Sequence, residues 1–220
     1  EEIVDGVVVI DLGGGVTDVT ILQGGKVRYI ASIPMGADAI NRDIHSLTIP
    51  EKYVEDLKVG YGSAIAERAE DDIINFQLKH HSRVKSVLRR NLVNTIEARL
   101  MDIAELVARV VRESGHGQNI VHGYVLTGGS AAIDKIDQLF ERETNRPCRV
   151  ATTLNGIGSK PQDCEITPGK HAAAAIMAQA AKYSSSYVVE SSPVQKAAVV
   201  PTEVEPTPVK PAEPKSVNPA

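Results

Sequence analysis

Hydrophobic residues alternate along the chain between strand-like runs and helix-like stripes. Residues 7–10 are all apolar, which is typical of a strand that is buried on both faces. Val19 and Ile21 share one face of a second strand, and alternation over residues 27–31 predicts a third. Further short apolar runs predict three more strands, at 73–78, 120–126 and 148–150, the last of them at a sheet edge.

Other segments carry apolar residues three or four positions apart, the period of a helix with one buried face. The stripes consist of Ala37, Ile40, Ile44 and Leu47; of Val54 and Leu57; of Leu92, Ile96, Leu100, Ile103, Val107 and Val110, widened by Met101 and Leu106; and of Ile133, Ile136 and Phe140. The third stripe predicts a long helix over 87–113, with Ser86 as a candidate N-cap. An alanine-rich helix is predicted over 170–182.

Shifts in composition suggest how these elements are divided into domains. Residues 63–86 are mostly charged or polar and interrupt the alternating pattern, and seven of the twelve prolines lie after residue 183. A proline-rich segment without a periodic apolar face cannot offset its conformational entropy by burial. We therefore expect one α/β subdomain made of 1–62 and 118–183, an inserted α+β subdomain at 63–117, and a disordered tail at 184–220.

Composition excludes some classes of function. The net charge of −4 gives no indication of nucleic acid as a general partner, so none is predicted. Cys148 and Cys164 have neither metal nor redox spacing, and no apolar run approaches the roughly 20 residues of a membrane span. His80 and His81 are adjacent, so their side chains diverge and do not predict a metal site. The chain begins at Glu1 without a methionine, and we expect it to be a fragment.

The richest candidate chemistry lies between the first two strands. Asp11 ends the first strand, Gly13, Gly14 and Gly15 follow, and the second strand then begins. A glycine turn exposes backbone N–H groups that can hold an anion, and Asp11 could hold Mg²⁺ through water. An ordinary tight hairpin is the alternative. The dinucleotide fingerprint and the P-loop are both excluded, because Asp18 stands where the former needs glycine and no Gly-Lys-Ser/Thr ending follows.

Two other pairs of residues are weaker candidates on their own. Glu55 and Lys58 are three positions apart on one helix face, a spacing that by itself favours a surface ion pair. Gly128 and Gly129 follow a predicted buried strand and precede a helix, so they could bring backbone N–H groups to a ligand or simply form a turn.

Together these segments resemble a known family. The string from Val7 to Ile21 resembles the second phosphate motif of the actin, Hsp70 and sugar-kinase ATPase superfamily, and Glu55-x-x-Lys58 and Thr127-Gly128-Gly129 follow in the order of that superfamily. The flanks are most similar to the bacterial cell-division protein family FtsA, through the strings at 33–38, 58–62 and 96–99. Val16 departs from the family by replacing a hydroxyl residue, and Leu88 and Asn91 depart from it at the start of the long helix.

The resemblance implies one half of an actin-like (ribonuclease H-like) ATPase fold that binds ATP with Mg²⁺ and is at most a weak ATPase. The nucleotide-binding residues that it implies are Asp11 (also the metal residue, through water), Gly13, Gly14, Gly15, Val16, Thr17, Asp18, Glu55, Lys58, Gly128, Gly129 and Ser130. Because the first half of such a fold is missing, we expect this chain alone to bind nucleotide weakly or not at all.

The resemblance also implies partners. An FtsA-like adaptor would polymerise like actin, bind the C-terminal tail of the tubulin-like FtsZ, and lie in the cytoplasm on the inner face of the membrane at the septum, through an amphipathic helix that this chain does not contain. The basic run 79–90 suits an acidic tail, with Arg89, Arg90 and Asn94 as contacts beside Leu88, Leu92 and Val93. A sugar or acetate kinase, an Hsp70-like ATPase and a pilus-assembly relative remain alternatives.

Overall fold

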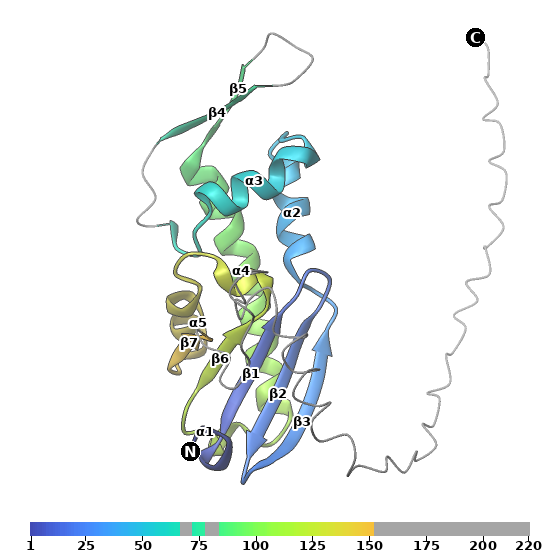
Figure 1. Cartoon of the computed structure of the whole chain (residues 1–220), viewed down its shortest axis with the longest axis vertical. Coiled ribbons are helices and arrows are strands. Elements are labelled where there is room, and N and C mark those ends of the chain that lie inside the picture. Colours follow the sequence, from blue (N-terminus) through green and yellow to red (C-terminus); the bar gives the residue numbers. More distant parts are fainter. Residues whose placement is uncertain (67–71, 78–83, 152–220) are drawn as a thin grey trace, which may run out of the picture. The chain divides into compact units, whose positions relative to one another are not determined.

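Strand β1 (Val7–Leu12) is the central strand of a five-stranded sheet with the order β3-β2-β1-β6-β7 (Figure 1). This computed structural model describes residues 1–66, 72–77 and 84–151. The other strands of the sheet are β2 (Thr17–Gln23), β3 (Lys26–Ile33), β6 (Tyr124–Thr127) and β7 (Cys148–Val150). The helices are α1 (Glu2–Asp5), α2 (Ala37–Ser46), α3 (Glu51–Tyr61), α4 (Arg89–Glu113) and α5 (Ile136–Thr144), with short 3-10 turns η2 (Gly117–Asn119) and η3 (Gly129–Ala132).

The register of the sheet brings two distant segments together. Strand β1 pairs antiparallel with β2 and parallel with β6. Asp11 lies opposite Asp18 on one side and opposite Thr127 on the other. The carboxyl ends of the parallel strands β1 and β6 therefore meet at one edge, so the turn after β1 and the Thr-Gly-Gly segment after β6 are neighbours.

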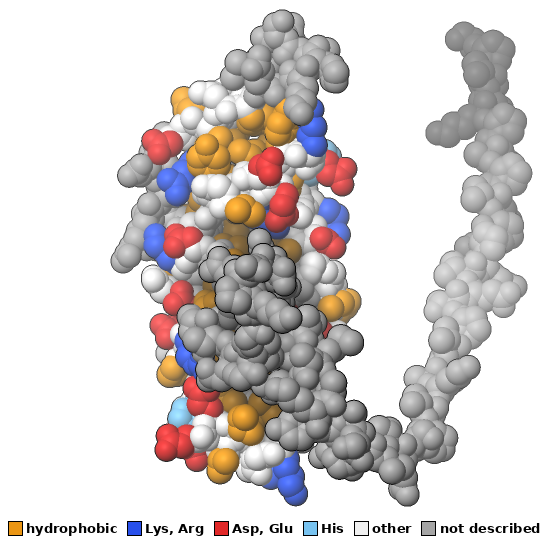
Figure 2. Space-filling model, in the orientation of Figure 1, with side chains coloured by type: hydrophobic (Ala, Val, Ile, Leu, Met, Phe, Trp, Pro, Cys, Tyr) orange, Lys and Arg blue, Asp and Glu red, His pale blue; other side chains and the backbone are white. Residues whose placement is uncertain are grey.

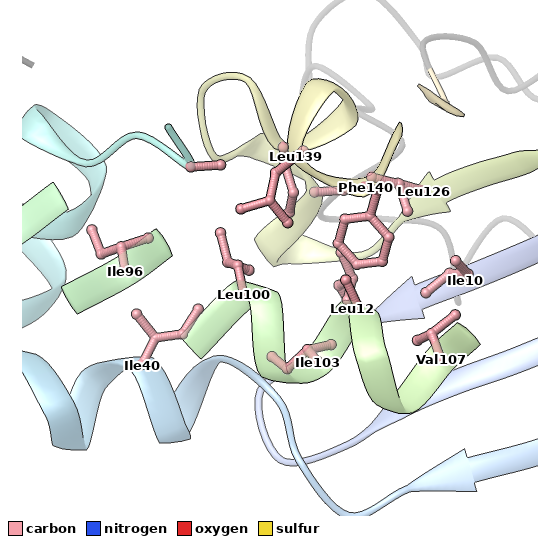
Figure 3. Packing of buried hydrophobic residues seen from close by; sticks show 14 of the residues in the cluster. Ile10, Leu12, Ile40, Ile96, Leu100, Ile103, Val107, Leu126, Leu139 and Phe140 are labelled. Carbon is pink, nitrogen blue, oxygen red and sulfur yellow. The ribbon is translucent and has the colours of Figure 1, made fainter. Parts of the chain in front are cut away.

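Helix α4 covers one face of the sheet and supplies much of the core (Figure 3). Its buried residues are Leu92, Val93, Ile96, Leu100, Ile103, Ala104, Val107 and Val111. Figure 3 shows Leu100, Ile103 and Val107 facing Leu12 of β1 and Phe140 of α5. These side chains are almost completely excluded from water, so the long apolar stripe predicted from the sequence is confirmed as core.

The start of α4 differs from the prediction. A helix from 87 with Ser86 as its cap is wrong, because residues 84–88 form strand β5 (Val84–Leu88) and the helix begins at Arg89. The Ser86 hydroxyl instead donates a hydrogen bond to Asn75 on the neighbouring strand β4 (Ile73–Gln77). Met101 was also expected to widen the buried stripe, but its side chain is 38% exposed.

Strands β4 and β5 form a separate two-stranded sheet that packs on α3. The rings of Tyr53 on α3 and Phe76 on β4 lie 5.4 Å apart, and Lys85 Nζ on β5 donates a hydrogen bond of 3.0 Å to the carbonyl of Thr48. One hydrophobic cluster runs from the five-stranded sheet through α4 to Ile74 of β4. The predicted domain boundaries therefore stay a prediction.

Several predicted features lie outside the described residues. These are the alanine-rich helix at 170–182, the tail at 184–220, and most of the basic run, including His80 and His81. Among the helices that the structure describes, none is both long and apolar enough to cross a membrane.

Candidate functional site

Hydrogen bonds to the carbonyl groups of the turn after β1 fix its conformation, and three of its N–H groups stay exposed. The N–H of Gly13 donates to the carbonyl of Val16 at 3.0 Å. The carbonyls of Gly13 and Gly14 accept hydrogen bonds from the N–H groups of Ala37 and Asp38, at 3.0 and 2.8 Å. Within the described residues, the N–H groups of Gly14, Gly15 and Val16 have no recorded acceptor, and all three residues are exposed. Such a row of N–H groups suits an anion.

Gly36 explains why helix α2 can approach this turn so closely. A Cβ atom at this position would collide with the carbonyl oxygens of Gly13 and Gly14. Glycine therefore lets the first turn of α2 press against the glycine turn and fix its carbonyls. The sequence predicted the glycine turn as the site, but this supporting role of Gly36 needed the structure.

A pair of carboxylates lies beside the turn. Asp11 and Asp18 face each other across β1 and β2, and partial burial together with the charge of Asp18 raises the pKa of Asp11. Gly128, whose φ is +91°, passes so close to Asp11 that a Cβ atom would collide with its carboxylate. Both carboxylates are hard oxygen donors, so their chemistry fits Mg²⁺.

Helices α2 and α3 contribute a hydrogen-bonded triad. Lys58 Nζ donates to Glu55 Oε2 at 2.8 Å and to Asn41 Oδ1 at 2.9 Å, and Asn41 Nδ2 donates to Glu55 Oε2 at 3.2 Å. Lys58 is only 8% exposed. The pKa of Glu55 is lowered, because the hydrogen bonds and charge of Lys58 and the Asn41 amide outweigh the desolvation that acts in the opposite direction.

These segments surround one cavity of about 820 Å³. The predicted residues Gly13, Gly14, Glu55, Lys58, Gly129 and Ser130 line it, together with Asp38, Asn41, Val59 and Thr127. The wall after β6 is the 3-10 turn η3 and not the start of a regular helix, since α5 begins only at Ile136. An isolated bridge between Ser63 and Asp134 links the end of α3 to this wall.

Some predicted residues do not reach the cavity. The Thr17 hydroxyl is completely buried and donates to the carbonyl of Met35 at 2.8 Å, so it anchors β2 to the segment before α2. Asp11, Gly15, Val16, Asp18 and Gly128 lie at the turn or beside it but not in the cavity wall. Asp38 and Asn41, which do line the cavity, were missed by the sequence analysis as site residues.

The three predicted partner contacts lie together on the first two turns of α4. Arg89 Nε donates to the carbonyl of Tyr61 at 3.3 Å, and Arg90 and Asn94 are exposed. Of the apolar neighbours expected there, Leu88 is 44% exposed, but Leu92 and Val93 are fully buried and cannot contact a partner. Two further exposed apolar residues lie near Arg89: Tyr61, whose carbonyl accepts its hydrogen bond, and Ile73, which pairs with Leu88. Hydrophobic side chains also gather over α3 in the upper part of Figure 2.

Comparison with known proteins shows the family of this chain. The family model described as cell division protein FtsA matches residues 8–176. The chain belongs to the FtsA family. FtsA of Pseudomonas aeruginosa is 32% identical over 155 residues, which are 70% of this chain and 37% of that protein. FtsA of Bacillus subtilis is also 32% identical over 155 residues, covering 70% of this chain and 35% of the relative. The match thus spans less than half the length of these FtsA relatives.

Solved structures support the fold of this FtsA-family chain. MreB5 of Spiroplasma citri bound to ADP superposes with a TM-score of 0.57 at 22% identity, over 69% of this chain and 50% of MreB5. The same protein bound to AMPPNP gives the same values. The expected actin-like α/β fold is therefore confirmed.

Proposed function

We propose that this chain is the nucleotide-binding C-terminal half of an FtsA-type cell-division adaptor, in which ATP acts as a ligand for assembly. The carrying observation is the convergence of the glycine turn, helix α3 and the Thr-Gly-Gly segment on one cavity. These segments are far apart in the sequence, and a turn with free N–H groups beside a cavity of this size suits a nucleoside phosphate. The bound ADP and AMPPNP of MreB5 are in keeping with this proposal.

Each wall has a role in this proposal. The N–H groups of Gly14, Gly15 and Val16 bind the terminal phosphates, and Glu55 and Lys58 contact the adenosine. Gly129 and Ser130 lie against the sugar and the α-phosphate. Asp11 and Asp18 hold Mg²⁺ through its water shell, and the cation would offset the repulsion between the two carboxylates and shield the phosphates from them. The hydroxyl of Thr17 has no part, because it is buried.

We also propose a dock for the acidic FtsZ tail on the surface formed by Tyr61, Ile73, Leu88, Arg89, Arg90 and Asn94. It combines exposed apolar side chains with two guanidinium groups at the start of α4. A peptide that mixes acidic and apolar residues is complementary to such a surface. Self-association into filaments and membrane attachment at the septum would belong to the full-length protein.

Replacing Lys58 tests the nucleotide site. In a full-length FtsA-family protein that contains this chain, Lys58→Ala should weaken ATP binding about tenfold, because a buried charged hydrogen-bond donor is lost. Lys52→Ala is the matched control, since Lys52 lies on the same helix but is exposed. Isothermal calorimetry gives both affinities. Equal affinity of wild type and Lys58→Ala would contradict the assignment. Micromolar binding of ATP by this chain alone would instead overturn the expectation that the chain by itself binds nucleotide weakly or not at all.

A further inference from the structure

Asn41 connects the two charged residues of the candidate nucleotide site. Its amide oxygen accepts from Lys58 Nζ, and its amide nitrogen donates to Glu55 Oε2. Lysine can only donate and an ionised carboxylate can only accept, so the two ends of the amide have one possible orientation. Asparagine suits this position because one short side chain carries both a donor and an acceptor.

The triad leaves two groups for a ligand. An ammonium group has three N–H donors, and within the described residues Lys58 uses two of them, towards Glu55 and Asn41. Both hydrogen bonds to Glu55 end on Oε2, and Oε1 has no recorded partner in the described part of the chain. One N–H and one carboxylate oxygen therefore remain on residues that line the cavity. This pair matches the vicinal hydroxyl groups of a ribose, which can accept one hydrogen bond and donate another.

We propose that Asn41 is a positioning residue that makes this site selective for ribonucleotides over deoxyribonucleotides. This inference rests on the proposed nucleotide-binding function. Without the amide, the Lys58 ammonium has Glu55 as its one remaining partner in the triad and turns towards both carboxylate oxygens. The ammonium and the carboxylate then hydrogen-bond only to each other. The third N–H of Lys58 and Oε1 of Glu55 are therefore no longer available to the sugar hydroxyl groups.

The test compares the binding of ATP and 2′-deoxy-ATP to a full-length FtsA-family protein that contains this chain, in the presence of Mg²⁺. We expect the wild type to prefer ATP about tenfold, the contribution of about one charged hydrogen bond. Asn41→Ala should lose about tenfold more affinity for ATP than for 2′-deoxy-ATP, which has one hydroxyl contact fewer to lose, so that the preference falls to about one. A loss of protein stability alone would lower the affinity for both ligands equally and leave the ratio of the two affinities unchanged.

Two further variants make the test specific. Asn41→Asp keeps the size and the acceptor for Lys58 but removes the donor to Glu55, so it should also lose the preference for ribose. Asn91→Ala makes the same truncation at an exposed position of α4 and should behave as wild type. If wild type binds ATP and Asn41→Ala retains the wild-type ratio, the role of Asn41 is refuted and the nucleotide site stands. If wild type binds no ATP, the proposed function is refuted, and this inference with it.

Discussion

Gly60 and Gly62 lie two positions apart at the end of α3, in very different surroundings. A Cβ atom at Gly60 would meet nothing within 4 Å, whereas one at Gly62 would collide with the carbonyl of Lys58 and lie 2.9 Å from Ile96 Cδ1. Gly60→Ala should therefore raise the free energy of unfolding by about 0.5–1 kcal/mol, since glycine weakens a helix interior. Gly62→Ala should lower it. Urea denaturation measures both, and a destabilised Gly60→Ala protein would contradict an open position for Gly60 within α3.

Asp11 illustrates a residue whose charge costs stability. Because its pKa is raised, the folded chain holds the proton more tightly than the unfolded chain, whose reference value is 3.8. The ionised carboxylate therefore destabilises the fold at neutral pH, and this cost disappears as the pH falls through the raised pKa. Asp11→Asn should stabilise the chain at pH 7, and the gain should shrink as the pH approaches 3.8. Urea unfolding at several pH values tests this, and a pH-independent loss of stability would contradict it.

At the scale of single residues, the sequence predicted those site residues that lie close together along the chain. Glu55 and Lys58 are one helical turn apart, so their shared face follows from the helix alone. Asn41 could not be found in the same way, because it meets them across the packing of α2 on α3. The burial of Thr17 was missed for the same reason, since its partner, the carbonyl of Met35, lies 18 positions away.

At the scale of elements, helix α4 links the layers of the fold through Glu97 and Arg99. The Glu97 carboxylate accepts from the N–H of Ala66 and pairs with Arg142 on α5, and Arg99 pairs with Asp43 on α2. The 3.6-residue period predicted the existence and the buried face of this helix. The period could not predict where the helix begins. Residues 84–88 form a strand because they pair with β4, and this pairing does not follow from the spacing of apolar residues along the chain.

Two adjacent residues of α4 test which side of this helix faces the hydrophobic core. Leu100 is fully buried, whereas Met101 is 38% exposed. Leu100→Ala should cost about 2–5 kcal/mol, because it leaves a cavity in the core. Met101→Ala should change stability by only about 0.5 kcal/mol, as surface substitutions do. Thermal and urea unfolding of the two variants would expose an error in the helix rotation if their costs were similar or reversed.

At the scale of the whole molecule, the order of three motifs was sufficient to predict the fold family. The parallel pairing of β1 with β6 brings the first and third motifs to one edge, and α3 supplies the second. The shape of the third wall, the 3-10 turn η3, was not predictable, since the same Gly-Gly string can precede a regular helix. The exposed apolar part of the dock was also mispredicted, because helix rotation buries Leu92 and Val93.

The adaptor function is tested most directly by the anisotropy of a fluorescent FtsZ C-terminal peptide titrated with this chain at two salt concentrations. The account predicts saturable micromolar binding that weakens at higher salt, since acidic groups of the peptide meet Arg89 and Arg90. The double variant Arg89→Glu and Arg90→Glu should bind more weakly, and Arg109→Glu, at a 52% exposed site further along α4, should bind as wild type. No binding by the folded chain would contradict the adaptor function proposed for this half of the molecule. Equal binding by wild type and the double variant would contradict the dock at Arg89 and Arg90.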